Sequence, residues 1–268
     1  MAKKKTRDPL EKFDNLNVPG HTTLRRLHNV NTEKNGYWIA MMCGYLMVAF
    51  FEFLHLFLIS KNATVQLLVM GLPFFAFALY RIRRNRRELE SIKLGWKGEV
   101  ATGYLLEELR TAGYTILHDL ETKEKGNIDH VVIGPAGVFA IETKTVSMPV
   151  DDKATITVGR ENELVIAGLL DIRKCKGRHP MDQARASAAM LARMIEDSSG
   201  KRTTVKPVLL YPGWWVNENA QSDVMVMNPK RFISVIRNMP AVLSSAQIQF
   251  ISKNLIRVQE ASYVIDLP

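Results

Sequence analysis

The stretch that decides the fold runs from Gly126 to Lys144. It reads GNIDHVVI over residues 126–133, GPAG over 134–137 and VFAIETK over 138–144. The two runs rich in Ile and Val favour β-strands, and the cluster of Gly and Pro between them predicts a tight turn. The stretch therefore predicts an antiparallel β-hairpin.

Three charged residues of this hairpin carry the chemistry. Glu142 and Lys144 are two positions apart on one strand, so their side chains point to the same face. Asp129 lies on the neighbouring strand and can meet them there. Two close carboxylates repel each other, but they are oxygen ligands of the kind that Mg²⁺ prefers. The spacing predicts a Mg²⁺ or Mn²⁺ site formed by Asp129 and Glu142, with the backbone carbonyl of Thr143 as a third ligand.

Such a cation would polarise a phosphodiester and lower the pKa of a bound water. Lys144 would orient that water, help to deprotonate it, or offset charge on the phosphorus-bound oxygens. The alternative is an ordinary strand pair with one exposed ion pair between Glu142 and Lys144, because triplets of this kind are common by chance. The place of the triplet at the end of a predicted hairpin, inside apolar strands, favours the metal site.

The hydrophobic periodicity predicts the surrounding elements. Helices are expected over residues 98–109, 180–195, 229–238 and 244–258, and strands over 114–120, 127–133, 138–146, 155–158, 163–167, 205–211 and 224–227. A helix between strands implies a crossover, so the order of helix, three strands, helix and strand predicts an α/β fold with a mixed sheet.

Two further polar residues have competing interpretations. Glu99 is expected in the first turn of its helix, where an acid is explained either by the helix dipole or by an accessory role at the metal site. His130 follows Asp129 in sequence and points to the opposite face, which favours a structural role.

Trp214 and Trp215 could stack on bases, but packing is the favoured interpretation.

The N-terminal part of the chain predicts a membrane segment. Residues 39–60 form an apolar run of 22 residues, and residues 63–80 form a second run of 18 without an ionisable side chain. An apolar helix of about 20 residues spans a bilayer core. The two runs therefore predict a transmembrane helical hairpin within residues 36–80. The alternative is a pair of buried helices in a soluble core.

The distribution of charge supports this interpretation and predicts the orientation. Residues 1–35 have a net charge of +4 and residues 81–97 a net charge of +5, while residues 36–80 are neutral. These segments account for the whole net charge of +9, so residues 98–268 are neutral. Positive flanks on both sides predict that both ends of the hairpin face the cytoplasm.

One pair of ionisable residues lies inside the first apolar run. Glu52 and His55 are three positions apart and share a helix face. A hydrogen-bonded pair at a contact between helices or between copies of the chain is the favoured interpretation, which predicts a possible homo-oligomer. A functional intramembrane pair is the alternative.

Several of these motifs together resemble a known family. The runs GWKGE (95–99), GNIDHVVIGP (126–135) and IETK (141–144) resemble the nuclease-related domain (NERD) family. That family is similar to the restriction-endonuclease-like superfamily with its PD-(D/E)-x-K active site. The resemblance covers roughly residues 95–211. The segment 145–149 departs from it, since the family has a polar, glycine-containing segment after its lysine.

The resemblance has implications for the fold and for the site. It implies a restriction-endonuclease-like αβββαβ core, metal ligands at Asp129 and Glu142, and a catalytic lysine at Lys144. It also implies contributions from Glu99 and from Gln183 on the later helix.

The expected organisation has four parts: a basic N-terminal segment (1–35), the transmembrane hairpin (36–80), a basic juxtamembrane linker (81–97) and a nuclease-like domain (98–268). The expected function is a membrane-anchored, Mg²⁺- or Mn²⁺-dependent nuclease whose partners are the lipid bilayer and nucleic acid, with DNA favoured. The alternatives are a non-catalytic module that binds nucleic acid or a protein partner at the membrane, and a membrane scaffold.

Overall fold

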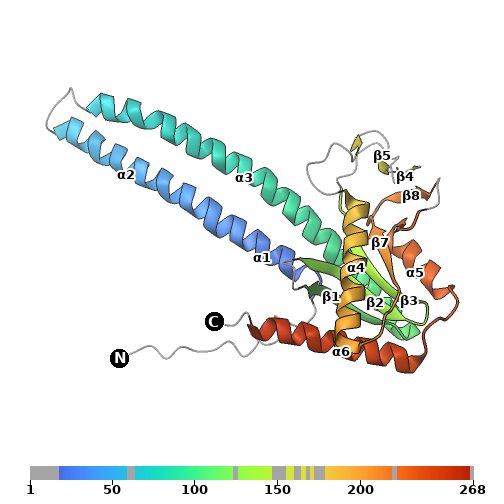
Figure 1. The fold of residues 1–268 in the computed structure, drawn as a ribbon. Coiled ribbons are helices and arrows are strands. Elements are labelled where there is room, and N and C mark those ends of the chain that lie inside the picture. The colour runs from blue at the N-terminus through green and yellow to red at the C-terminus, as the bar shows by residue number, and fades with distance from the viewer. Residues whose placement is uncertain are drawn as a thin grey trace, which may run out of the picture. The chain divides into compact units, whose positions relative to one another are not determined.

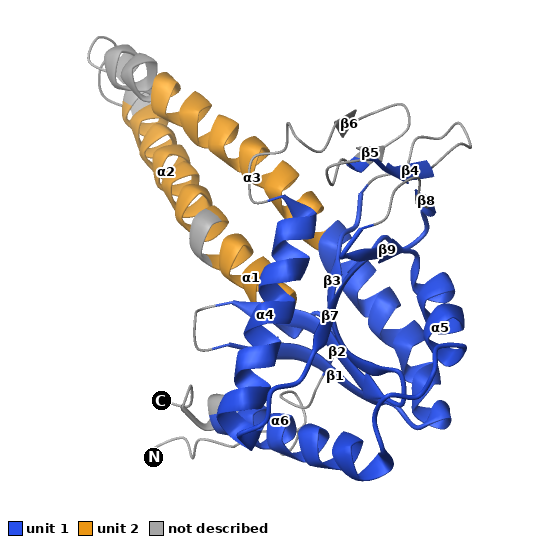
Figure 2. Cartoon of the chain, turned by 45° about the vertical axis from the view of Figure 1, so that its right-hand side comes forward, with its two compact units in different colours: residues 1–22, 94–268 blue, residues 23–93 orange. Residues whose placement is uncertain are grey.

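The computed structural model describes residues 18–58, 64–122, 126–146, 155–159, 164–166, 170–171, 179–218 and 222–265. The first 17 residues of the basic N-terminal segment lie outside the described residues, and so do residues 61–62, the short polar stretch between the two apolar runs. The chain divides into two compact units (Figure 2). One unit comprises residues 23–93, and the other comprises residues 1–22 together with 94–268.

The unit of residues 23–93 is helical. Its elements are α1 (His21–Asn29), a π-helical turn (Val30–Asn35), α2 (Gly36–Leu58) and the first part of α3 (Thr64–Leu106). α2 is apolar on all sides except where Glu52 and His55 lie, as its sequence from Tyr37 to Leu58 shows. A helix without a polar face is typical of a protein core or of a membrane span.

Contacts within this unit pair α2 with α3 in antiparallel fashion. The ring of Trp38 lies 5.5 Å from the ring of Phe77 in an edge-on arrangement. The guanidinium of Arg81 also lies over the Trp38 ring, 5.3 Å from its centroid. Nearer the start of α2, Nδ2 of Asn85 donates a hydrogen bond of 2.9 Å to Oδ1 of the buried Asn35. The pairs run in opposite directions along the two helices, as a helical hairpin requires.

Among the described residues, one helix is long and apolar enough to cross a membrane by length and composition. It is the continuous helical stretch His21–His55, and none of its most apolar window is buried. The second apolar run of the sequence coincides with the beginning of α3. Within α2, the structure describes no hydrogen bond between Glu52 and His55.

The other unit is built on a mixed sheet of five strands in the order β1-β2-β3-β7-β9 (Figure 1). The strands are β1 (Thr115–Glu121), β2 (Asn127–Gly134), β3 (Gly137–Thr143), β7 (Val205–Leu210) and β9 (Met225–Met227). β1, β2 and β3 are antiparallel to one another, whereas β7 is parallel to β3 and β9 is parallel to β7. The expected α/β fold with a mixed sheet is confirmed.

The predicted β-hairpin at the centre of this sheet is also confirmed. Gly134 pairs with Gly137 across the turn, and the ladder continues to the pair His130 and Ile141. The parallel strand β7 follows a helical crossover, α4 (Pro180–Ser199). The side chain of His179 accepts a hydrogen bond from the backbone N–H of Met181 at the start of α4. The order of helix, three strands, helix and strand is therefore the observed one, with insertions.

Helices cover both faces of the sheet. On one face, Phe139 and Ile141 pack with the end of α3 and with α5 (Pro229–Arg237), which contributes Phe232. On the other face, the alternate residues Val138 and Ala140 pack with α4 and with α6 (Ser245–Ile265). Figure 1 shows α4 and α6 together on this side of the strands. This burial on both faces explains the near-continuous apolar run of β3.

A second, smaller sheet lies near the start of α4. It has the order β6-β5-β4-β8, with β4 (Thr155–Val158), β5 (Leu164–Ile166), β6 (Leu170–Asp171) and β8 (Trp215–Glu218). Its buried residues form one cluster with Met181 and Ala184 of α4 and with Tyr211 and Trp214. β4 and β5 were expected from the sequence, whereas β6 and β8 were not.

The start of the helix expected over residues 98–109 was predicted wrongly. The helix does not begin at Gly98, because α3 is continuous from Thr64 to Leu106. A short 3-10 helix, η2 (Glu107–Ala112), follows it and ends at Gly113, which adopts the left-handed conformation at a φ of 82°. The stop at Gly113 is therefore as expected. The compact unit that contains the five-stranded sheet begins at Leu94 within α3, and it also includes the chain up to Thr22.

The turn of the central hairpin generates a stability prediction. A Cβ atom on Gly134 would lie 2.0 Å from Cδ1 of the Tyr114 ring, which is held by a hydrogen bond from its hydroxyl to the carbonyl of Ile236. We expect Gly134→Ala to reduce the free energy of unfolding by about 1–3 kcal/mol, the usual cost of overpacking a core. The measurement is the thermal unfolding midpoint of the purified chain.

Gly126→Ala is the matched control, because a Cβ atom there would meet nothing closer than Oγ1 of Thr122 at 3.6 Å. An unfolding midpoint for Gly134→Ala equal to that of the control would contradict the packing described for the turn.

Candidate active site

The strand register brings the three charged residues of the hairpin together. His130 of β2 pairs with Ile141 of β3, so the next position on each strand carries Asp129 and Glu142. Lys144 follows the last residue of β3, and its backbone N–H donates a hydrogen bond of 2.9 Å to the carbonyl of Leu210 on β7. The parallel strand thus fixes the backbone at the point where the lysine begins.

Asp129 is held by the backbone of the opposite strand. Its Oδ2 atom accepts a hydrogen bond of 2.7 Å from the backbone N–H of Thr143. The residue is 9% exposed, and the bond is buried. A hydrogen bond from an N–H to a buried carboxylate is among the stronger ones in proteins. Asp129 is therefore fixed in position before any ligand binds.

Glu142 and Lys144 form an ion pair. Nζ of Lys144 donates to Oε1 of Glu142 at 2.6 Å, with side-chain exposures of 32% for the lysine and 12% for the glutamate. The prediction that both side chains share one face is confirmed. The pair is not the exposed surface pair of the alternative interpretation, because the glutamate is largely withdrawn from water and Asp129 is part of the same cluster.

The surroundings of Asp129 disfavour its charged form. Burial raises the pKa of Asp129 well above its usual 3.8, and the negative charges of Glu142 and Glu99 raise this pKa further. The hydrogen bond from Thr143 and the positive charge of Lys144 act in the opposite direction but are weaker. The cluster thus has more negative charge than its lysine neutralises, which is the condition that a bound cation relieves.

The same carboxylates stabilise the charged form of Lys144. Burial opposes the charge, yet the charge and the hydrogen bond of Glu142, together with the charges of Asp129 and Glu99, raise the pKa of Lys144 above its usual 10.5. In the metal-free protein the lysine is therefore an ammonium group at neutral pH.

Glu99 reaches the site from the interior of α3. The helix starts at Thr64, so the dipole of a first turn does not explain an acid at this position. A Cβ atom on the buried Gly98 would lie 1.6 Å from Oγ1 of Thr145, which shows how closely α3 approaches the chain after Lys144. Glycine at 98 permits this approach, and Glu99 is thereby near enough for its charge to act on Asp129.

Gln183 lies in the first turn of α4 and is partly buried. Its backbone N–H donates to the carbonyl of His179 at 3.0 Å. The neighbouring Met181 and Ala184 pack with Leu209, which pairs with Glu142 in the register between β3 and β7. The structure thus places Gln183 on the helix that covers the site end of these strands. The role of Gln183 stays a prediction.

The structural interpretation of His130 agrees with its surroundings. His130 and His118 pair across β2 and β1, both are buried, and their Nδ1 atoms lie 2.9 Å apart. Nε2 of His118 lies 2.9 Å from Oε1 of Glu107. Burial lowers the pKa of His130 well below its usual 6.5, so the ring is neutral. This pair is directed away from the carboxylate cluster, as strand alternation requires.

The two tryptophans differ from each other. Trp214 is 1% exposed, and its Nε1 donates to the carbonyl of Val146 at 3.1 Å, so it packs in the core and holds the chain that leaves the site. Trp215 is 61% exposed, and its Nε1 donates to Oδ1 of Asn217 at 2.9 Å.

One part of the site region was not expected from the sequence: the segment before α1. A Cβ atom on Gly20 would lie 3.3 Å from Oε2 of Glu99 and 2.7 Å from Cδ1 of Trp96. The Pro-Gly pair at 19–20 marks a turn in the sequence. That signal says nothing of a contact with Glu99, because the two residues are 79 positions apart by their numbers.

The donor set can be tested against a divalent cation. Within the described part of the chain, no group of three or more His, Cys, Asp or Glu side chains has a metal-binding arrangement. The chemistry of the donors nevertheless fits a divalent cation, because a buried Asp129 carboxylate lies in the field of two further acids with a single lysine among them. Nζ of Lys144 contacts Oε1 of Glu142, so the lysine occupies one of the oxygens that would hold such a cation.

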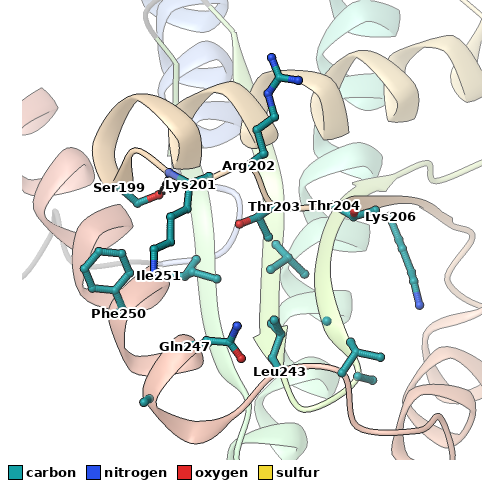
Figure 3. Close-up of a pocket in the computed structure, with 15 residues that line it drawn as sticks. Ser199, Lys201, Arg202, Thr203, Thr204, Lys206, Leu243, Gln247, Phe250 and Ile251 are labelled. Atoms are coloured by element: carbon teal, nitrogen blue, oxygen red, sulfur yellow. Dashed lines mark hydrogen bonds between the residues drawn. The ribbon is translucent and has the colours of Figure 1, made fainter.

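A pocket of about 600 Å³ lies elsewhere, beside the turn of the central hairpin (Figure 3). It is lined by Gly137 and Val138 at the start of β3, whereas Glu142 is near the end of that strand. Figure 3 shows Lys201 directed toward Phe250 and Arg202 turned away from it. Arg202 forms an ion pair of 2.9 Å with Glu196. The basic side chains therefore do not converge on one point, and the pocket is separate from the carboxylate cluster.

The shift of the Asp129 pKa predicts a stabilising substitution. A raised pKa means that the folded protein binds this proton more tightly than the unfolded chain, so stability falls as the pH rises above the unfolded value near 3.8. We expect Asp129→Asn, whose amide oxygen can still accept from Thr143, to stabilise the metal-free protein at pH 7 by on the order of 1 kcal/mol. Thermal unfolding in chelator at several pH values measures the effect.

The gain in stability of Asp129→Asn is expected to shrink as the pH approaches 3.8. At that pH the aspartic acid of the wild type is protonated in the folded protein, so it is neutral like the asparagine. Asp223→Asn is the control. Its hydrogen bonds from Arg185 lower the pKa of Asp223, so the same substitution there gives no gain. A loss of stability in Asp129→Asn at pH 7 would show that the charged carboxylate is favourable in the fold.

Comparison with known proteins agrees with the geometry. Residues 94–212 match the sequence profile of the family described as the nuclease-related domain, NERD. No curated protein and no solved structure matches the chain. The matched residues contain the end of α3, the central hairpin, α4 and β7, and thus all the elements that carry the carboxylate cluster. The chain therefore carries a nuclease-related domain over residues 94–212.

Proposed function

We propose that this protein is a membrane-anchored, metal-dependent nuclease that hydrolyses phosphodiester bonds of DNA. The observation that carries the proposal is the buried carboxylate of Asp129. It is fixed by the Thr143 N–H at 2.7 Å and lies in the field of Glu142 and Glu99. A cluster with this much uncompensated acid is unfavourable for stability alone, and perturbed groups of this kind gather at functional sites.

Asp129 and Glu142 would hold Mg²⁺ or Mn²⁺, with the backbone carbonyl of Thr143 as a further oxygen donor. When bound, the cation polarises the phosphodiester and lowers the pKa of a bound water. The protein supplies the position of both carboxylates, because the register of β2 against β3 sets them side by side. It also excludes water, since Asp129 is 9% exposed.

Lys144 supplies positive charge to the reacting phosphate. The carboxylates around it keep its ammonium group protonated, so it is suited to stabilise charge on the phosphorus-bound oxygens. With Asp129 and Glu142 engaged as ligands, Nζ of Lys144 would be available to a phosphate oxygen, from a backbone position that β7 fixes.

Glu99 and Gln183 complete the proposed site from the two helices. Glu99 on α3 acts on the charge of Asp129 and is suited to hold water at the cluster. Gln183 lies at the start of α4, where a neutral amide can orient water or a phosphate oxygen without adding charge. The two helices lie on either side of the strands that carry the carboxylates.

The choice of DNA rests on the resemblance to restriction-endonuclease-like enzymes. The neutrality of residues 98–268 argues against tight binding by this part of the chain alone, because contacts with phosphates dominate affinity for nucleic acid. The basic segment 81–97, with a net charge of +5, would supply such contacts and would also attract lipid headgroups.

Anchoring is proposed for both apolar runs. The helix His21–His55 meets the requirements of one span, and the antiparallel contacts of α2 with α3 support a second one that returns the chain to the same side. The basic residues on both flanks support a cytoplasmic position for the nuclease domain. Glu52 and His55 would face another helix of the hairpin or of a second copy.

A second candidate function has one observation in its favour. Within the described part of the chain, the acids are not arranged as a metal-binding group. A non-catalytic module that binds nucleic acid or a protein partner at the membrane would need no such arrangement. It would also have no need of Lys144 beside Asp129 and Glu142, which is why the nuclease is preferred.

Cleavage of DNA is the direct test of the proposal. The purified whole chain in detergent is expected to cut DNA with Mg²⁺ or Mn²⁺ and not with chelator. Asp129→Ala and Lys144→Ala are each expected to lower the rate by at least about 100-fold, in line with the loss of a group that stabilises the transition state. Asp223→Asn, which changes an exposed carboxylate paired with Arg185 and outside the cluster, should cut at the wild-type rate.

A folded protein that binds DNA equally well with and without Lys144, and that cuts neither single- nor double-stranded DNA nor RNA, would favour the binding module instead.

Membrane anchoring is tested by fractionation. The whole chain should stay with membranes through an alkaline carbonate wash, because removing one apolar span from the bilayer exposes about 20 apolar residues to water. A fragment of residues 86–268 should be found in the soluble fraction. Recovery of the whole chain in the soluble fraction without detergent would rule out the anchor.

A further inference from the structure

The segment of residues 18–22 lies directly against the part of α3 that carries Glu99. A Cβ atom on Gly103 would lie 2.5 Å from Cγ of Pro19, so the proline occupies the space that this glycine leaves. The buried Gly20 has a φ of +76° and faces both Trp96 and Oε2 of Glu99. We call residues 18–22 the strap. Two glycines and a left-handed backbone conformation are needed for this approach.

The strap is fixed at its end by Asp119 of β1. Oδ2 of Asp119 accepts from the backbone N–H of Thr22 at 3.0 Å, and Oδ1 accepts from the Thr22 hydroxyl at 2.5 Å. Nδ2 of Asn127 on β2 donates to both Oδ1 of Asp119 at 2.7 Å and the Thr22 hydroxyl at 2.9 Å. These four bonds close a network around a carboxylate that is 1% exposed.

The backbone of Asp119 is unusual in a way that fits this role. It has a φ of 50°, and among the described residues it is the one non-glycine residue with a positive φ. The ladder between β1 and β2 pairs His118 with His130 and Leu120 with Ile128, and it omits the pair between Asp119 and Asp129. Strain of this kind persists only where surrounding contacts impose it, and it gathers at functional sites.

We propose that the strap is a positioning element of the active site, in which Asp119 and Thr22 hold Gly20 against Trp96 and thereby fix the carboxylate of Glu99. The inference rests on the proposed nuclease function. It makes the site depend on the chain segment that leads into the first apolar helix. A wall against Glu99 restricts its rotamers and keeps water from it, and small displacements of a catalytic group are costly in rate.

Gly20→Ala tests the strap with a minimal change. The new Cβ atom would lie 2.7 Å from Trp96 and would also be strained by the positive φ, so the strap has to move away from Glu99. Gly113→Ala is the matched control. Gly113 has a φ of +82°, so it carries the same backbone strain, but its added Cβ atom would have nothing within 4 Å.

The experiment is a double-mutant cycle on the whole chain in detergent. It compares wild type, Gly20→Ala, Glu99→Gln and the double variant by single-turnover DNA cleavage in Mn²⁺. Gly20→Ala is expected to lower the maximal rate about tenfold with little change in the DNA concentration needed for half of it. In the Glu99→Gln background the same substitution should change the rate by less than about twofold, because it acts through Glu99.

Equal losses from Gly20→Ala in both backgrounds, or a loss in Gly113→Ala as large as that in Gly20→Ala, would overturn the inference. Asp119→Asn, which removes one of the two acceptor oxygens for Thr22, should also lower the maximal cleavage rate. In the Glu99→Gln background it should change that rate by less than about twofold, as expected for Gly20→Ala.

Calorimetric titration with Mn²⁺ separates the inference from the proposed function. If wild type binds Mn²⁺ but does not cut DNA, the nuclease proposal fails while the strap remains testable. In that case a weaker Mn²⁺ affinity in Gly20→Ala than in Gly113→Ala supports the strap, and equal affinities overturn it. If wild type neither cuts DNA nor binds Mn²⁺, both proposals fail together.

Discussion

The hydrogen bond from the Thr143 N–H to Oδ2 of Asp129 is the interaction on which the site depends. It links two neighbouring strands through a buried carboxylate rather than through a backbone carbonyl. Burial and two nearby acids disfavour the charged form of this carboxyl group and therefore raise the pKa of Asp129. The fold tolerates this group because the central hairpin is covered on both faces by apolar clusters, which stabilise the sheet. Local instability at Asp129 is thus compatible with a stable sheet.

The other elements position groups around that carboxylate. β7, parallel to β3, fixes the backbone of Lys144 through the carbonyl of Leu210. α3 approaches through Gly98 and carries Glu99, and the indole of Trp214 holds the chain that leaves the site at Val146. Each contact uses a residue type that the position requires: a glycine where helix and chain touch, and an indole where a buried carbonyl needs a donor. Lys144 is the one positively charged side chain described beside Asp129, Glu142 and Glu99. A bound cation would therefore change mainly the net charge of this cluster.

Much of this was predictable from local patterns, and the remainder was not. The hairpin, its turn and the facing pair of Glu142 and Lys144 follow from alternation and from the glycines at 134 and 137, which are properties of neighbouring residues. The beginning of α3 was misplaced because the basic segment before Gly98 interrupts the apolar pattern, although its Arg, Glu and Leu residues favour a helix. The bonds of Thr22 to Asp119 join residues 97 positions apart and depend on the tertiary fold, so no spacing rule reveals them.

The central claim is that the carboxylates of Asp129 and Glu142 form a binding site for one divalent cation. The most direct measurement is anomalous X-ray scattering from crystals of the protein soaked in Mn²⁺. The account predicts a single strong peak between these two carboxylates, with Nζ of Lys144 moved away from Oε1 of Glu142. Crystals that bind Mn²⁺ only elsewhere, or that keep the contact between Lys144 and Glu142 unchanged at high Mn²⁺ concentration, would contradict it.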